Sequence, residues 1–185
     1  LMVTDLIGFE ATGIYAIMMF FAVLVAVPGR GLNAIAPLKF GQLWADRDFT
    51  GLNSLYHKTS QNQLIIAGFV YVSLLGVMPG VFAAMPNGTT FSAGYFVVLW
   101  LGLAHFTQLG FGDSGRILFY SDHYKHNFYF ILIMLALVIG LNWILIPKYG
   151  LNGAGFATFL SQLILNIIRL IFLRKKYDLR PFNRN

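Results

Sequence analysis

Apolar runs separated by short polar segments dominate the chain and determine its predicted architecture. Five runs, at 13–40, 64–85, 92–112, 128–146 and 154–173, are each close to or above the ~20 residues that a helix needs to cross a bilayer. Backbone groups in lipid must be hydrogen-bonded within the segment, so these runs are predicted to be helices. Residues 1–8 are expected to end a further, earlier span. The pattern therefore predicts an all-α fold, a polytopic transmembrane helical bundle.

Polar segments between the runs are predicted to be the connections of this bundle. The segment 44–62 is expected to include a short helix in the membrane interface, because apolar residues recur along it. Those residues are Phe49, Leu52, Leu55 and Tyr56. The segment 115–127 is the next polar crossing, whereas 85–91 and 147–153 contain the proline, glycine and asparagine of tight turns.

Lysine and arginine in the connections predict the orientation of the bundle. Cytoplasmic loops carry an excess of these residues. The cations on one predicted side are Arg47, Lys58, Arg116, Lys125, Arg174, Lys175, Lys176, Arg180 and Arg184. Lys148 alone stands on the other side. We therefore expect a multi-pass protein of the inner (cytoplasmic) membrane, with the basic loops and the C-terminal tail in the cytoplasm.

The composition excludes several other classes of protein. The chain is 57% hydrophobic and only 11% charged, whereas soluble domains contain about 25% charged residues. The chain has a net charge of +6, but its basic residues lie beside the apolar runs, so nucleic acid is not an expected partner. The chain has no cysteine, which excludes disulfides and thiolate metal sites. No cofactor, metal or catalytic residue is predicted.

Two cations, Arg30 and Lys39, lie inside the first apolar run. A charge in hydrocarbon is costly, so such a residue marks a functional site by default. On a helical wheel Arg30 shares a small and polar face with Asn33, and Lys39 lies on the opposite face, near the cytoplasmic end. We predict that Arg30 faces a water-filled cavity in a helix bent by prolines and glycines, and that Lys39 mostly reaches water. A structural role for Arg30, reaching water or paired with a carbonyl freed near Pro37, stays open.

Polar stripes also mark the third and fifth runs. His105 and Gln108 share one stripe, where His105 is either a proton-linked switch or a hydrogen-bonding partner between helices. Arg116, at the mouth of this stripe, is expected to pair with Asp113. The stripe of the fifth run is expected to join helices, with its cation reaching the cytoplasmic side. It comprises Gly155, Thr158, Gln162, Asn166 and Arg169.

A resemblance to a known family becomes specific near the end of the chain, at LNWILIPKYGLNGAGFATFLSQLILNIIRLIFLRKKYDLRPF. This pattern resembles the C-terminal half of polysaccharide biosynthesis proteins. These are the O-antigen and capsule flippases of the multidrug/oligosaccharidyl-lipid/polysaccharide exporter superfamily. The earlier segments TGIYAIMMFFAVLVAVPGRGLNAIAPLKFGQLWADRD and SDHYKHN resemble the helix that opens the second lobe and the crossing before the eleventh helix.

The resemblance implies a transporter and not an enzyme. Its substrate would be a lipid-linked oligosaccharide, a glycan on a polyprenyl diphosphate, moved from the cytoplasmic to the outer leaflet. Residues 1–185 would be a single transmembrane domain, a partial second lobe expected to continue beyond both ends. The other expected partners are membrane lipids and the missing N-terminal lobe and C-terminal helices of the same protein. The predicted substrate-binding residues are Arg30, Asn33, Lys39, His105 and Gln108.

Three other classes stay open. A cation-coupled multidrug exporter of the same superfamily would favour carboxylates in its cavity, but the acids near the runs, Asp5, Glu10 and Asp113, lie toward their ends. A membrane-embedded enzyme, such as an acyltransferase using His105 or a polysaccharide polymerase, would need a base with positioned partners or a large outer loop. The third class is a purely structural membrane subunit.

Overall fold

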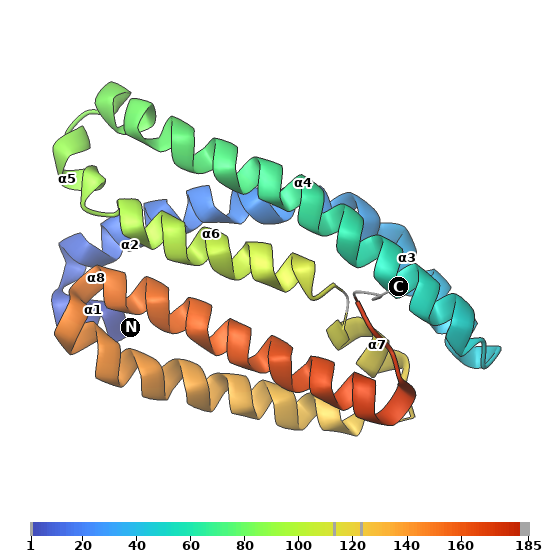
Figure 1. Ribbon diagram of the computed structural model, residues 1–185. Coiled ribbons are helices and arrows are strands. Elements are labelled where there is room, and N and C mark those ends of the chain that lie inside the picture. The colour runs from blue at the N-terminus through green and yellow to red at the C-terminus, as the bar shows by residue number, and fades with distance from the viewer. Residues whose placement is uncertain (1, 113, 123, 182–185) are drawn as a thin grey trace.

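The computed structural model describes residues 2–112, 114–122 and 124–181, and within these ranges the chain is helical and contains no β-strand (Figure 1). The side chains of Met2 and residues 30–35 lie outside this description. The elements are α1 (Met2–Ile7), α2 (Phe9–Val23), the 3₁₀ segment η1 (Leu24–Ala26), α3 (Val27–Ala45), α4 (Phe49–Ala84), α5 (Gly88–Ser92), α6 (Tyr95–Gly110), α7 (Ser114–Tyr120) and α8 (Lys125–Tyr177). The all-α prediction is confirmed.

Three helical stretches of the described residues are long and apolar enough to cross a membrane. These three stretches are Phe9–Gly29, α4 and α8. The pair α6 and α7, which is bent by 47°, makes a fourth if it is counted as one span. The bundle is therefore suited to a membrane. Five separate spans are not shown, since the runs 128–146 and 154–173 are the two arms of α8 on either side of Gly150 and are counted here as one stretch.

Helix α8 consists of two helical arms that meet at a sharp kink at Gly150, where the chain reverses direction. The φ of 58° and ψ of −135° at Gly150 are not helical. Figure 1 shows two arms, one before and one after this residue, that run back along each other. Ring contacts of Phe172 with His126 and Phe130 join the two arms at the far end from the turn. The predicted turn at 147–153 is thus present, and it interrupts the helical geometry at Gly150.

The first apolar run is helical throughout but changes its winding before Pro28. The 3₁₀ segment η1 separates α2 from α3, and Pro28 is at the start of α3. Proline has no N–H to donate and crowds the carbonyl four residues earlier, which disrupts regular α-helical bonding. The bend predicted from these prolines and glycines corresponds to a local change of winding just before Pro28.

Helix α4 corrects the prediction for residues 44–62. A separate interface helix was expected there, but α4 runs unbroken from Phe49 to Ala84, about 54 Å along its axis. The Asp48 carboxylate caps its start by accepting a hydrogen bond from the Gly51 N–H at 2.8 Å. Leu52, Tyr56 and Gln63 are buried at helical spacing, so one face of the polar segment continues into the bundle.

Two apolar cores occupy opposite ends of the bundle. The core at one end joins α2, α4 and α6 through residues such as Met18, Met78 and Val97. The other joins α3, α4, α7 and α8, and includes Phe40 and Leu52. Along α4 and along the path from α2 to α3, the residues between these two cores include Ala26 and Gln63. The level between the cores is therefore where polar groups enter the interior.

Aromatic side chains join helices at the end that carries the basic connections. Trp44 packs edge-on against Tyr177 with ring centroids 4.8 Å apart, and against Phe49 at 5.6 Å. These three residues form one cluster that links α3, α4 and the end of α8.

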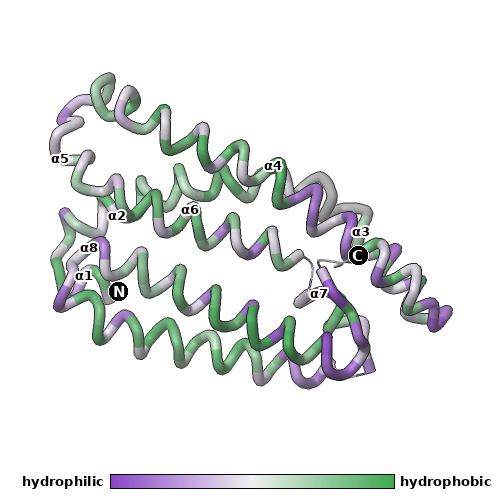
Figure 2. The backbone as a smooth tube through the Cα atoms, in the orientation of Figure 1, coloured by the Kyte–Doolittle hydropathy of each residue, from purple (hydrophilic) through white to green (hydrophobic). Residues whose placement is uncertain are grey.

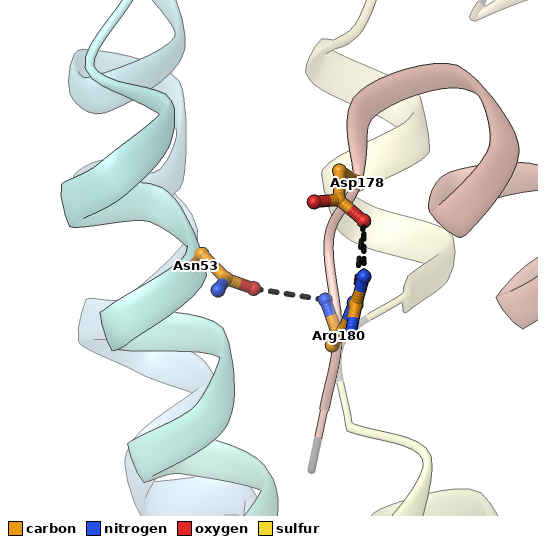
Figure 3. Close-up of polar contacts among 3 residues, drawn as sticks. All are labelled: Asn53, Asp178 and Arg180. Atoms are coloured by element: carbon orange, nitrogen blue, oxygen red, sulfur yellow. Dashed lines mark hydrogen bonds and ion pairs between the residues drawn. The ribbon is translucent and has the colours of Figure 1, made fainter. Parts of the chain in front are cut away.

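The segment after α8, residues 178–181, lies against α4 and is called the strap below. Arg180 donates its backbone N–H to Asn53 Oδ1 at 2.8 Å, and its guanidinium pairs with Asp178 at 2.9 Å (Figure 3). The Pro181 carbonyl lies 2.8 Å from His57 Nδ1, so this nitrogen is the donor. Leu179 between these contacts is only 1% exposed. The strap therefore ties the end of α8 to the start of α4.

Large apolar side chains cover much of the outer surface. Phe69 on α4 is 75% exposed and Trp143 on the first arm of α8 is 69% exposed. In Figure 2 most of both elements is hydrophobic, and hydrophilic colour gathers near α7, at the C-terminal end and at the start of α4. Such extensive exposed apolar surface marks contact with lipid or with another protein. It indicates a membrane-embedded protein.

Candidate functional site

A polar cavity of about 480 Å³ lies within the otherwise apolar bundle. Its polar lining residues come from four helices: Gln63 of α4, Gln108 of α6, Ser114 and Arg116 of α7, and Asn127, Asn166 and Arg169 of α8. Ala26, Leu109 and Phe119 provide an apolar part of the wall. The volume falls in the range of about 300–1,000 Å³ that small-molecule sites occupy. Convergent polar groups in such a cavity define the candidate binding site.

Arg169 provides a cation well inside the second arm of α8. It precedes Arg174 of the basic end by five residues, which corresponds to about 7.5 Å along the helix axis. Its Nη2 lies 3.5 Å from Asn127 Oδ1, which is a long contact, and its buried Nε has no hydrogen-bond partner. Among the described residues no carboxylate lies within ion-pair distance of this guanidinium. Its charge is therefore directed at the cavity without an acidic partner in that part of the chain.

Two buried amides face the same cavity. Gln63 and Asn166 are each 2% exposed, and Gln63 Nε2 and Asn166 Nδ2 have no partner among the described residues. Leaving such a buried group unpaired costs about 1–3 kcal/mol. A ligand that accepts hydrogen bonds would remove this cost, which makes the two amides candidate ligand-binding groups.

The turn after α6 leads into α7, which carries Arg116. Tyr56 of α4 holds this turn by donating its hydroxyl to the Phe111 carbonyl at 2.7 Å. Gly112 has a φ of +62°, which favours glycine, and a Cβ there would collide with Ser60 Oγ. A Cβ at Gly115 would lie 3.2 Å from Arg169 Nη1. Glycine at both positions therefore lets α7 approach α4 and α8 closely.

The structure places the five predicted substrate-binding residues differently. Gln108 lines the cavity. His105 is half-buried in α6 but is not among the lining residues, and Lys39 is exposed on α3. The backbones of Arg30 and Asn33 belong to α3, and their side chains lie outside the described part of the structure. Asp113 also lies outside it, and with it the predicted pair with Arg116.

Sequence reasoning assigned no substrate-binding role to Arg169, Asn166 or Gln63. Arg169 was expected to reach the cytoplasmic side, but the structure places it in the cavity wall. The available signal was the spacing of Asn166 and Arg169, which puts an amide and a cation on one helix face. Gln63 lies between the predicted connection at 44–62 and the predicted span at 64–85, and its burial follows from the continuity of α4.

The cavity wall contains cations and amides, and no aspartate or glutamate from the described residues. Within the same ranges, no three histidine, aspartate or glutamate side chains gather as metal ligands would. No protein-family model, no curated protein and no solved structure matches the chain. The fold and its apolar helices define the class as an all-helical, membrane-embedded bundle.

Proposed function

We propose that this chain belongs to a membrane transporter that moves a lipid-linked oligosaccharide across the bacterial cytoplasmic membrane for surface polysaccharide synthesis. The polar cavity with two arginines, set among apolar helices, is the observation that carries this proposal. Guanidinium groups bind phosphate oxygens through strong, charge-assisted hydrogen bonds. A polyprenyl diphosphate carries such oxygens together with a lipid tail that the exposed apolar surface would accommodate. The resemblance to the flippases supports the same substrate.

The proposed topology has five crossings. Helices α2 and α3 together make the first crossing, α4 makes the second, and α6 and α7 together make the third. The two arms of α8 make the fourth and fifth. Figure 1 supports this arrangement, because the turn at Gly150 lies at the same end as α5, opposite the strap and α7. The basic connections then share one side of the membrane. That side is cytoplasmic in the proposal, since cytoplasmic loops are rich in lysine and arginine.

Arg30 is included in the proposal as a second anion receptor. Ala26 lines the cavity, and the backbone of residue 30 follows it by about one helical turn. An intramembrane cation near such a cavity is a functional candidate. Asn33, Lys39 and His105 stay in the proposal on their sequence pattern, and Gln108 on its place in the cavity wall as well.

The chemistry of the cavity favours this substrate over that of a cationic drug exporter. An organic cation would meet Arg116 and Arg169, and no carboxylate of the described residues lines the cavity to bind it. An acyltransferase based on His105 has less support, because His105 lies outside the cavity wall and acid–base catalysis needs positioned partners.

Deleting the native gene tests the transport function. We expect surface polysaccharide to fall and the lipid-linked glycan to accumulate in the cytoplasmic leaflet, because synthesis continues without translocation. Restoring the complete gene should reverse both effects, measured by surface glycan staining and by analysis of extracted lipid-linked glycan. Unchanged polysaccharide together with increased sensitivity to cationic drugs would support the multidrug exporter instead.

In the same assay, Arg30→Ala should greatly reduce export at matched protein abundance. A charge-assisted contact contributes about 1.5–3 kcal/mol, or about ten- to a hundredfold in affinity. Arg30→Lys should retain part of the activity, since it keeps a cation but loses the bidentate geometry. Lys39→Ala is the matched control, with a smaller expected loss because Lys39 is exposed. Normal export by Arg30→Ala would return Arg30 to a structural role.

Single cysteines test the orientation, since the chain contains no cysteine of its own. We expect a membrane-impermeant thiol reagent outside the cell to label Thr89→Cys and Lys148→Cys, and not to label Lys175→Cys. All three positions are exposed, so access depends on the side of the membrane. Ser121 would be a poor reporter because it is only 3% exposed. The reverse labelling pattern would overturn the proposed orientation.

A further inference from the structure

We infer that the cavity is a binding site for a phosphoryl group, with Arg169 supplying charge and Gln63 and Asn166 supplying neutral hydrogen-bond donors. This inference deepens the proposed transport function and rests on it for the identity of the ligand, the diphosphate of the lipid-linked glycan. It assigns the binding role to residues of α4 and α8 that the sequence pattern did not single out for substrate binding.

Arg169 determines the sign of the charge that the ligand carries. A guanidinium offers only donors and keeps its charge at any physiological pH. Asn127, its one hydrogen-bonding side chain among the described residues, is neutral and lies at the long distance of 3.5 Å. Arg116 of α7 lines the same cavity. The site therefore favours an anion.

The two amides set the shape of the ligand. Gln63 and Asn166 are almost completely buried and unpartnered in the described structure, and each can turn its NH₂ group to the cavity. With Arg116 they approach from three helices, α4, α7 and α8, and so from different directions. A phosphoryl group has oxygens arranged tetrahedrally and can accept from all of them, whereas a carboxylate has two oxygens in one plane. The donor set therefore fits a phosphoryl group.

The reversal of α8 at Gly150 makes the site possible. Asn127 and Arg169 are 42 residues apart in the sequence but meet across the two arms. Gln63 reaches the same cavity because α4 continues past its polar segment. Gly115 leaves room for the Arg169 guanidinium, since a Cβ at this position would lie 3.2 Å from Nη1.

Direct binding to the complete purified protein tests the inference. The protein is held in a maltoside detergent and phosphate-free buffer, and the probes are inorganic pyrophosphate, polyprenyl diphosphate and a polyprenol of the same length. We expect both diphosphates to bind, and the uncharged polyprenol to bind at least tenfold more weakly than its diphosphate. Arg169→Gln should weaken diphosphate binding about ten- to a hundredfold, and Arg169→Lys should weaken it less.

Two further variants separate a specific site from general charge attraction. Lys175→Gln removes one positive charge at an exposed position beyond the cavity, so binding should be unchanged. Gly115→Val keeps every charge but crowds Arg169, so it should weaken binding. Equal losses of diphosphate binding in Arg169→Gln and Lys175→Gln would overturn the inference. So would chloride that displaces the bound polyprenyl diphosphate as well as pyrophosphate does. Melting temperatures of all variants identify any loss of binding that results from unfolding.

The source of the phosphoryl group follows from the two probes. Tighter binding of polyprenyl diphosphate than of pyrophosphate supports a lipid-linked ligand, and equal binding supports the site with a soluble phosphate as its source. If no diphosphate binds but glycan export still depends on the gene, this site is overturned and the transport function stands. If diphosphate binds to the site but deletion of the gene leaves the surface glycan unchanged, only the transport function is overturned.

Discussion

Gly153→Ala is expected to destabilise the chain by about 3 kcal/mol, at the upper end of the usual cost of overpacking. Gly153 begins the second arm of α8, and a Cβ there would lie 2.6 Å from the backbone carbonyl carbon of Leu145 and 3.1 Å from the backbone nitrogen of Ile146. Both atoms belong to the backbone of the first arm, so a rotamer change cannot relieve the clash. Thermal or denaturant unfolding of the purified protein in detergent measures the loss.

Gly140→Ala is the matched control for this prediction. It makes the same chemical change in the first arm of α8, where nothing lies within 4 Å of the added Cβ. We expect no loss, and a small gain of up to about 1 kcal/mol from helix propensity. Equal stability of the two variants would contradict the fold-back of α8 at Gly150. Because Asn127 and Arg169 meet only across this fold-back, Gly153→Ala should also weaken the anion site.

Leu179→Asp is expected to release the strap, at a cost of about 3.5–5 kcal/mol in the free energy of unfolding. Leu179 is only 1% exposed in the core at the basic end, and an ionised carboxylate buried there would cost several kcal/mol. The segment avoids that cost by leaving α4. It then loses about 1.5–3 kcal/mol of leucine burial and about 1 kcal/mol for each hydrogen bond, to Asn53 and His57.

Trypsin cleavage next to the exposed cations Arg174, Lys175 and Lys176 provides the measurement, because release of the strap frees the end of α8. Arg180→Gln is the control. It removes only the exposed ion pair with Asp178, worth about 0–1 kcal/mol, and keeps the backbone N–H that Asn53 accepts. The cleavage rate should rise for Leu179→Asp and stay near that of the parent protein for Arg180→Gln. An unchanged rate in both would show that the strap is not held at Leu179.

The sequence determined the helical class and some helix boundaries, because both depend on local properties. An apolar run of sufficient length predicts a helix wherever it later packs, and the third run at 92–112 corresponds closely to α6 at Tyr95–Gly110. The change of winding before Pro28 is equally local, since it follows from the missing N–H of proline. The interface helix at 44–62 was wrong because polarity alone does not end a helix, and one face of that segment continues a buried stripe.

Only the tertiary structure decided which polar residues form the site. Gln108 could be proposed from its stripe, but Gln63, Asn166 and Arg169 become candidate binding residues only because they line one cavity with residues of other helices. Arg169 five residues from a basic end is equally compatible in sequence with reaching water or facing a cavity. The reversal at Gly150 and the close approach of α7 at Gly115 select the cavity. A charge pattern along one helix fixes which face a residue occupies, whereas packing between helices fixes what that face meets.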